Sequence, residues 1–131
     1  MTSKPPLAPL VLKRDGLFTS NCETNPVFCK YNIFYLRYCS SDNFSGNKSY
    51  KPREGDPDIF RFQGQNILKA MIKQIVDLHP DIKKASRIIL HGESSGAVGI
   101  QNQGDLLTGL LKSLLGPSKV DIRIFADSGW F

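Results

Sequence analysis

The sequence is poor in cysteine and histidine and has no long apolar run, and each shortage excludes a class of protein. Its 131 residues include three cysteines, two histidines and one tryptophan. The cysteines have no C-x-x-C spacing and no histidine nearby, so we expect no metal site. No apolar run approaches the roughly 18 residues that a membrane-spanning helix needs, so we expect no membrane span. The first residues are interrupted by three prolines and do not predict a signal peptide.

Charge is not concentrated in any part of the chain, which argues against a nucleic-acid-binding protein. The formal net charge is +5, from 17 basic and 12 acidic side chains. The basic residues are spread along the sequence, as on a solvated surface, and attraction to nucleic acid or to an acidic polysaccharide is the alternative interpretation. Basic and aromatic residues do not interleave in the way that stacks bases. We therefore expect no nucleic-acid partner.

The odd number of cysteines leaves the redox environment open. Cys22 and Cys29 can form a disulfide across a loop that contains Pro26, and Cys39 then remains single. A single cysteine fits either a reducing compartment or a pairing partner outside this sequence.

Hydrophobic periodicity predicts an α/β fold. Hydrophobic residues make up 40% and charged residues 22% of the chain, which is typical of a folded domain and excludes general disorder. Runs that predict strands alternate with helical patterns, so we expect a mostly parallel sheet flanked by helices. The expected elements are strands at residues 31–38, 87–91 and 120–126, a helix at 65–78, and a helix-compatible stretch from 97 that includes the apolar residues 106–115.

The motif Gly92-x-Ser94-x-Gly96 directly follows the second expected strand and matches a nucleophile elbow. In an elbow the serine lies on a strained turn between a strand and a helix, and the flanking glycines let the two elements approach. The helix N-terminus and the N–H of Ser95 can then stabilise the oxyanion that forms when Ser94 attacks an ester carbonyl. The motif is short, and the alternative is a serine- and glycine-rich loop without chemistry.

Five segments between residues 21 and 131 share their pattern with one known family. They are Asn25-Pro-Val-Phe28 with Tyr31-Asn32, Tyr38-Cys-Ser-Ser-Asp42 with Phe44-Ser-Gly46, Phe60-Arg-Phe-x-Gly64, Gly92-x-Ser94, and Ala126-Asp-Ser-Gly-Trp-Phe131. In order and at matching spacing, they resemble the pectin acetylesterase/Notum family of α/β-hydrolase-type serine carboxylesterases.

The resemblance implies a secreted carboxylesterase with a Ser-Asp-His triad and no metal or organic cofactor. Ser94 corresponds to the family nucleophile, and Ser95 to the residue whose N–H joins the oxyanion hole. The substrate would be an acylated polysaccharide, such as acetylated pectin, or an acylated protein that carries a palmitoleoyl group, and we expect a monomer. Cys39 corresponds to a family cysteine that is expected to be disulfide-bonded to a partner outside this sequence, which explains the odd cysteine count better than a reducing compartment does.

The sequence also departs from the family pattern. Gly96-Ala97 replaces a Gly-Gly pair, while Tyr31 and Phe44 stand where the family has tryptophan. The family's upstream Gly-Gly-x-x-Cys segment has no counterpart in residues 1–20, and its catalytic Asp and His lie beyond the Trp-Phe pair. We therefore expect residues 1–20 to be an irregular segment and residues 21–131 to be the central part of an esterase domain, incomplete at both ends. The alternative is a truncated or non-catalytic relative that acts as a binding or vestigial module.

Two histidines and several polar residues are secondary candidates. His79 precedes a proline at the expected end of a helix, and His91 is only three residues before Ser94, so neither is well placed as the general base. Asp127 ends a strand at the edge where α/β sites are built, and a turn-forming role is favoured over a triad role. For Ser41 and Asp42, we expect loop shaping rather than substrate contact.

Overall fold

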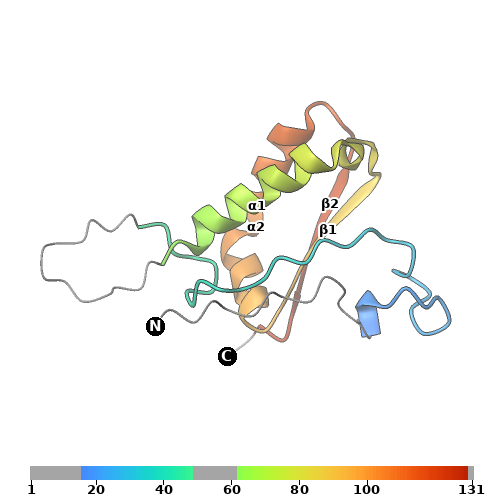
Figure 1. Ribbon diagram of the computed structural model, residues 1–131, viewed down its shortest axis with the longest axis horizontal. Helices are drawn as coiled ribbons and strands as arrows, with labels where there is room; N and C mark the ends of the chain where they lie inside the picture. Colours follow the sequence, from blue (N-terminus) through green and yellow to red (C-terminus); the bar gives the residue numbers. More distant parts are fainter. Residues whose placement is uncertain (1–15, 49–61, 130–131) are drawn as a thin grey trace, which may run out of the picture. The chain divides into compact units, whose positions relative to one another are not determined.

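Two long helices and two parallel strands dominate the fold, shown in Figure 1 as a computed structural model of the protein. The structure describes residues 16–48 and 62–129. The chain divides into two units, Met1–Tyr35 and Leu36–Phe131. Within the described residues, no helix has the length and apolar character required to cross a membrane.

The first unit contains a short 3-10 helix, η1 (Gly16–Phe18), and a loop closed by a disulfide. Cys22 and Cys29 are bonded, with their Cα atoms 5.1 Å apart, which confirms the pairing across the Pro26 loop. Asn25 is buried inside this loop, and its side-chain amide donates hydrogen bonds to the carbonyls of Leu17 and Thr19, each at 2.9 Å. Cys39 in the second unit is exposed and carries a free thiol.

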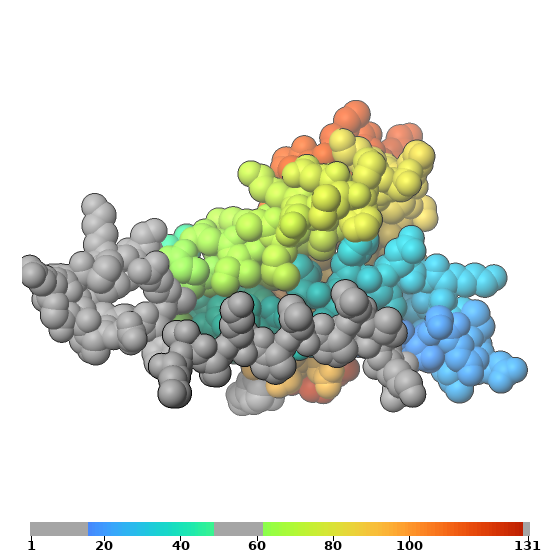
Figure 2. Space-filling view, viewed as in Figure 1, coloured from blue at the N-terminus to red at the C-terminus, as the bar shows by residue number. Residues whose placement is uncertain are grey.

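Helix α1 (Gly64–Leu78) confirms the helix predicted from the spacing of its apolar residues. Leu68, Ile72 and Val76 recur every four residues, so they share one face of the helix and are buried together. The helix ends at Leu78 and is capped by His79, after which Pro80 begins the short 3-10 helix η2 (Pro80–Lys84). The outward face of α1 forms a continuous part of the surface in Figure 2.

Strands β1 (Arg87–Glu93) and β2 (Asp121–Asp127) form a two-stranded parallel sheet, which confirms the second and third predicted strands and their parallel pairing. Their register pairs Arg87 with Asp121 and His91 with Phe125. At the start of the sheet, the Asp121 carboxylate accepts from Arg87 Nε at 2.8 Å and from Arg123 Nε at 2.7 Å. The Arg87 hydrogen bond contributes most to holding the pKa of Asp121 below its ordinary value. Both arginines are exposed and the Asp121 side chain is 33% exposed, so their ion pairs add little to stability.

Helix α2 (Ser95–Leu115) connects the two strands and includes the second predicted apolar stretch. It ends at Gly116, whose φ of 69° lies in the left-handed region that glycine adopts without a steric penalty. Pro117 follows and prevents the helix from continuing. Strand, helix and parallel strand thus form one crossover unit.

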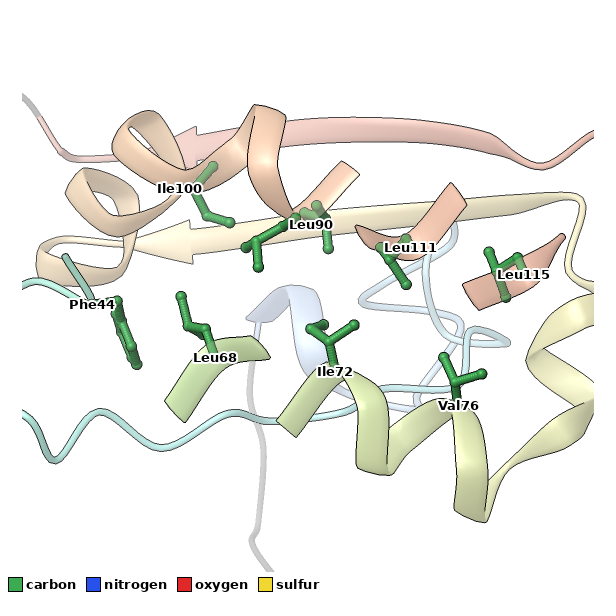
Figure 3. Close-up of a cluster of buried hydrophobic side chains, with 9 residues drawn as sticks. Phe44, Leu68, Ile72, Val76, Leu90, Ile100, Leu111 and Leu115 are labelled. Atoms are coloured by element: carbon green, nitrogen blue, oxygen red, sulfur yellow. The ribbon is translucent and has the colours of Figure 1, made fainter. Parts of the chain in front are cut away.

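The hydrophobic core lies where α1 and α2 pack together over one face of the sheet. Figure 3 shows side chains of α1 facing those of α2, with Leu90 of β1 pointing toward them. The buried members of this cluster are Phe44, Leu68, Ile72, Val76, Leu90, Ile100, Leu107, Leu111 and Leu115. Burying such side chains contributes about 1.5–3 kcal/mol each, so this cluster is the main source of stability in the unit.

The strand predicted at residues 31–38 is wrong. These residues are not part of the β1–β2 sheet, and Tyr31, Phe34 and Tyr35 are between 39% and 59% exposed. Aromatic and β-branched residues favour a strand only where a neighbouring strand supplies the backbone ladder. Segments that follow one another along a chain need not be neighbours in a parallel sheet, so composition alone could not place this one. The predicted correspondences at Phe60, Arg61, Trp130 and Phe131 lie outside the described residues.

Candidate active site

Ser94 lies at the turn between β1 and α2, as the motif predicted. It is the residue immediately before α2 and has φ 52° and ψ −120°. A positive φ is unusual for a residue with a side chain and costs on the order of 1–3 kcal/mol, which the surrounding structure must offset. The side chain of Ser94 is exposed. The turn therefore presents the hydroxyl to solvent at the carboxyl end of a parallel strand.

The hydroxyl of Ser94 is not used as a helix cap. A serine in this position normally accepts a hydrogen bond from a backbone N–H in the first turn, which stabilises the helix by about 1 kcal/mol. Ser94 makes no such side-chain bond, and its carbonyl instead accepts from the N–H groups of Ala97 at 2.9 Å and Val98 at 3.1 Å. The side chain thus forgoes its usual structural role, which is the arrangement expected of a nucleophile.

Gly92 and Gly96 have different steric roles in the motif. A Cβ on Gly92 would lie closer than 3.0 Å to the backbone of Gly96 and Ala97, so only glycine allows α2 to approach β1 this closely. A Cβ on Gly96 would meet no atom of the described structure within 4 Å. The prediction that glycines on both sides of Ser94 let the strand and helix approach is therefore correct for Gly92 and wrong for Gly96 within the described part of the chain.

The end of β2 holds the turn in place. The backbone N–H of Ser94 donates to the carbonyl of Asp127 at 3.0 Å. The carboxylate of Asp127 accepts from the Ser128 hydroxyl at 2.9 Å, and Ser128 has a φ of 53°. A Cβ on Gly129 would overlap Ala97 of α2. The segment Asp127–Gly129 thus fits against the first turn of α2, and Asp127 acts there through its backbone.

The N-terminus of α2 supplies donors beside Ser94. The first N–H groups of a helix have no partner within the helix, and they carry the positive end of its dipole. The N–H groups of Ala97 and Val98 donate to the Ser94 carbonyl, so the N–H of Ser95 precedes those bonded groups and lies next to Ser94. Such N–H groups suit the negative charge that develops on a carbonyl oxygen when a nucleophile attacks its carbon.

A second structured loop, Ser40–Gly46, is organised around the carboxylate of Asp42. Its Oδ1 accepts from the Ser40 hydroxyl at 2.5 Å, and its Oδ2 accepts from the N–H groups of Gly46 at 2.9 Å and Gly64 at 2.8 Å. The last bond ties the loop to the first residue of α1. Asp42 therefore shapes the loop, as expected from its place in the sequence.

The same contacts explain the ionisation of Asp42. Burial raises the pKa of this carboxyl, but the hydrogen bond from Ser40 and those from the backbone outweigh it. The pKa of Asp42 consequently lies below its ordinary value of 3.8. The group is a carboxylate at neutral pH, and three or more donors already occupy it.

Loop Ser40–Gly46 also packs against α2 near the elbow. Phe44 is buried, and a Cβ on Gly99 would lie 3.0 Å from its ring. Asn102 Nδ2 donates to Ser45 Oγ at 3.3 Å. Ser41, Asn43 and Phe44 all have positive φ values between 50° and 57°. Strained backbone of this kind is concentrated at functional sites. Here it packs against the first turns of α2, the helix that follows Ser94.

The structure places neither histidine beside the Ser94 turn: His91 points to the face of β1 opposite α2, and His79 lies at the C-terminal end of α1. Leu90 and Gly92 face α2, so the alternation of side chains directs His91 to the opposite face of the sheet. There its ring stacks on Phe125, with centroids 5.2 Å apart and planes 25° from parallel. His79 is an exposed residue at the far end of α1. Neither position favours proton transfer with Ser94.

Sequence reasoning missed two contacts that build the site. The first is the Asp127 carbonyl that holds the Ser94 N–H, because backbone acceptors leave no mark on side-chain identity. The second is the bond between Asp42 and Gly64, although the glycines at 46 and 64 were a usable signal. A Cβ on either glycine would overlap the Asp42 carboxylate. Within residues 16–48 and 62–129, no three His, Cys, Asp or Glu side chains gather as a metal site.

A parallel strand, a strained turn at an exposed serine, and a helix whose N-terminus faces that turn form part of an α/β fold with the geometry of a nucleophile elbow. A family model described as Pectinacetylesterase matches residues 8–131. The chain belongs to the pectinacetylesterase family.

Several curated proteins are similar to the chain, and all cover most of it. It is 34% identical over 116 residues to the palmitoleoyl-protein carboxylesterase notum1a of Danio rerio. This match covers 88% of this chain and 22% of the relative. It is 32% identical over 123 residues to notum2 of Xenopus laevis, covering 94% of this chain and 24% of the relative. The chain thus spans less than a quarter of the length of these relatives. No solved structure matches it.

Proposed function

We propose that this chain carries the nucleophile of a carboxylic ester hydrolase, and that Ser94 is that nucleophile. The observation that carries the proposal is the strained, exposed Ser94 turn, whose hydroxyl caps no helix and whose backbone is tied to Asp127. The surrounding structure must offset the conformational cost of the positive φ at Ser94. The Ser94 side chain makes no helix-capping hydrogen bond that would explain this conformation. Membership of the pectinacetylesterase family supports the same chemistry.

In the proposed reaction, Ser94 Oγ attacks the acyl carbon of an ester and the alcohol leaves. The N–H of Ser95 and the N-terminus of α2 stabilise the tetrahedral oxyanion. Water then releases the acyl group from the acyl-enzyme and regenerates the serine. Every step uses amino-acid side chains and backbone groups, and we propose no cofactor.

The general base is proposed to come from residues that this sequence does not include. His91 stacks on Phe125 on the other face of the sheet, and Asp127 serves the turn through its carbonyl. The chain spans under a quarter of its relatives, which leaves room for a triad Asp and His elsewhere in a longer protein. We propose that residues 21–131 form the central part of such an esterase domain.

The proposed substrate is an acyl ester on a protein or on a polysaccharide. The similar proteins are named palmitoleoyl-protein carboxylesterases, and the matching family model is described as Pectinacetylesterase, a name that refers to acetyl esters of pectin. We propose that the protein acts as a monomer in the secretory or extracellular space. The Cys22–Cys29 disulfide supports this location, since such bonds persist in oxidising compartments.

The competing proposal is a non-catalytic relative that keeps the fold as a binding module. The positions of His79 and His91, neither of which serves Ser94, favour it. Hydrolysis of a short-chain aryl ester by the longest natural protein that contains this sequence separates the two. Ser94→Ala should abolish turnover, whereas Ser95→Ala, which keeps the backbone N–H, should retain most of it. Equal rates for wild type and Ser94→Ala would support the binding module.

A further inference from the structure

The loop Ser40–Gly46 contains the tripeptide Asn43-Phe44-Ser45, which is an acceptor sequence for N-linked glycosylation. We propose that Asn43 carries an N-linked glycan. The proposal goes beyond ester hydrolysis and uses only one part of the proposed function, the passage through the secretory pathway.

The folded loop leaves Asn43 free to carry a bulky group. Its side chain is exposed, while its neighbours Asp42 and Phe44 are fixed by hydrogen bonds and by the core. The backbone N–H of Asn43 donates to the Tyr38 hydroxyl at 2.8 Å, so the loop is held through its backbone at this residue. The φ of 50° is one that asparagine adopts more readily than most residues. Asn43 is thus held through its backbone, while its side-chain amide stays exposed within the described residues.

The order of synthesis makes the sequence accessible before the loop closes. In the folded loop, the Ser45 hydroxyl donates to the Asn43 carbonyl at 3.1 Å and accepts from Asn102 at 3.3 Å. The loop is further fixed by Gly64 and Gly99, which lie later in the sequence. A chain is made from its N-terminus, so Asn43 emerges while these partners are still missing. Transfer to the extended tripeptide then precedes folding.

The modification is a substitution at the sugar. The Asn43 amide nitrogen forms a bond to the anomeric carbon of an oligosaccharide that is linked to a lipid diphosphate. The bond from that carbon to the diphosphate oxygen breaks, and the lipid diphosphate leaves with its electron pair. The amide loses one proton to a base of the transferase. The product is a neutral glycosylamide, and no oxidant or reductant is needed.

The direct test is to express the whole 131-residue chain behind a cleavable secretion leader in animal cells. The total cellular pool is then treated with peptide N-glycosidase in heavy-oxygen water, which converts a glycosylated asparagine to heavy-labelled aspartate. We expect the label at Asn43 in the tryptic peptide Tyr38–Lys48. This peptide also contains Asn47 of the sequence Asn47-Lys48-Ser49, so fragmentation must assign the site.

Matched variants make the outcome decisive. Asn43→Gln and Ser45→Ala should each remove one glycan from the electrophoretic pattern, and Ser45→Thr should keep it, because threonine also completes the acceptor sequence. Asn47→Gln should leave the label on Asn43. Glycosylation precedes folding, so a variant that fails to fold still reports on the site in the total pool.

Two results would overturn the proposal: an unlabelled Asn43 in the wild type, or a pattern that Asn43→Gln leaves unchanged. The Cys22–Cys29 disulfide, read from the same sample without reduction, shows whether the chain reached an oxidising compartment. A bonded but unglycosylated chain would refute the glycan at Asn43 and leave the proposed location and ester hydrolysis standing.

Discussion

Gly92 is the residue on which the elbow depends sterically. A methyl group there would overlap the backbone of Gly96 and Ala97, which cannot move without shifting α2 away from β1. We expect Gly92→Ala to lower the free energy of unfolding by about 2–3 kcal/mol. Urea denaturation followed by circular dichroism measures this change.

Gly96→Ala is the matched control for that substitution. A Cβ at this position meets nothing within 4 Å, and the residue lies in the first turn of α2. Alanine favours a helix over glycine by about 1 kcal/mol, so this variant should be as stable as the wild type or more stable. Equal losses in both variants would mean that the close approach of α2 to β1 is not what requires Gly92.

Because of Asp42, we expect the free energy of unfolding to fall as the solution becomes acidic. Its pKa in the folded state is lowered below 3.8 by hydrogen bonds that the unfolded chain lacks. A lowered pKa contributes stability that is complete above about pH 4 and is lost as the pH falls through the folded-state value. In Asp42→Asn the amide keeps the shape of the side chain but not its charge. The stability difference between wild type and this variant should therefore shrink as the solution is acidified below about pH 4.

The comparison of urea midpoints across that range tests this prediction. Asp42→Asn removes the charge and replaces the oxygen that faces Ser40 with an NH2 donor, but its amide oxygen can still accept from Gly46 and Gly64. Asp42→Ala leaves both N–H groups without their acceptor and should cost more, about 1–3 kcal/mol. A difference that stays constant with pH would show that the carboxylate of Asp42 does not gain its stability from these bonds.

At the scale of elements, α1 is attached to the unit through one apolar stripe. Ile72 lies in the middle of it and is 5% exposed, between Leu68 and Val76. Ile72→Ala should cost about 2–4 kcal/mol because it leaves a cavity in the core. Lys73→Ala, one residue along on the exposed face, should change the stability by less than about 0.5 kcal/mol. Similar costs for both would contradict the packing of α1 on α2.

The sequence predicted those elements whose identity is local, and it failed where an element depends on a distant partner. The stripe of α1, the apolar run of β1 and the turn at Ser94 each follow from periodicity or from glycine spacing within a few residues. The segment at residues 31–38 has a strand-like composition but is not part of the sheet, because a strand exists only where another strand pairs with it. The Asp127 carbonyl at Ser94 was equally beyond reach, since it depends on the fold and not on the side chain.

At the scale of the whole molecule, the chain matches only one segment of much longer relatives. It covers 24% of notum2 of Xenopus laevis and 22% of notum1a of Danio rerio, yet it includes the complete strand–turn–helix–strand unit around Ser94. We expect the isolated 131-residue chain to show no esterase turnover above that of Ser94→Ala. A Ser-Asp-His triad that lacks its His and Asp loses several orders of magnitude in rate.

An aryl-ester assay of the isolated chain beside Ser94→Ala measures this directly. Turnover that is present in the chain and lost in Ser94→Ala would mean that one of its own histidines serves as the base, with His91 the first to substitute. A version extended beyond Phe131 that recovers activity would locate the missing groups in the added residues.

The central claim is that Ser94 is the reactive nucleophile, and covalent labelling tests it most directly. A fluorophosphonate reacts with an activated serine by forming a phosphorus–oxygen bond as fluoride leaves, and peptide mass spectrometry identifies the residue. In the longest natural protein that contains this sequence, the label should lie on Ser94, persist in Ser95→Ala and disappear in Ser94→Ala. A label on another residue, or one that Ser94→Ala leaves unchanged, would contradict the assignment of Ser94.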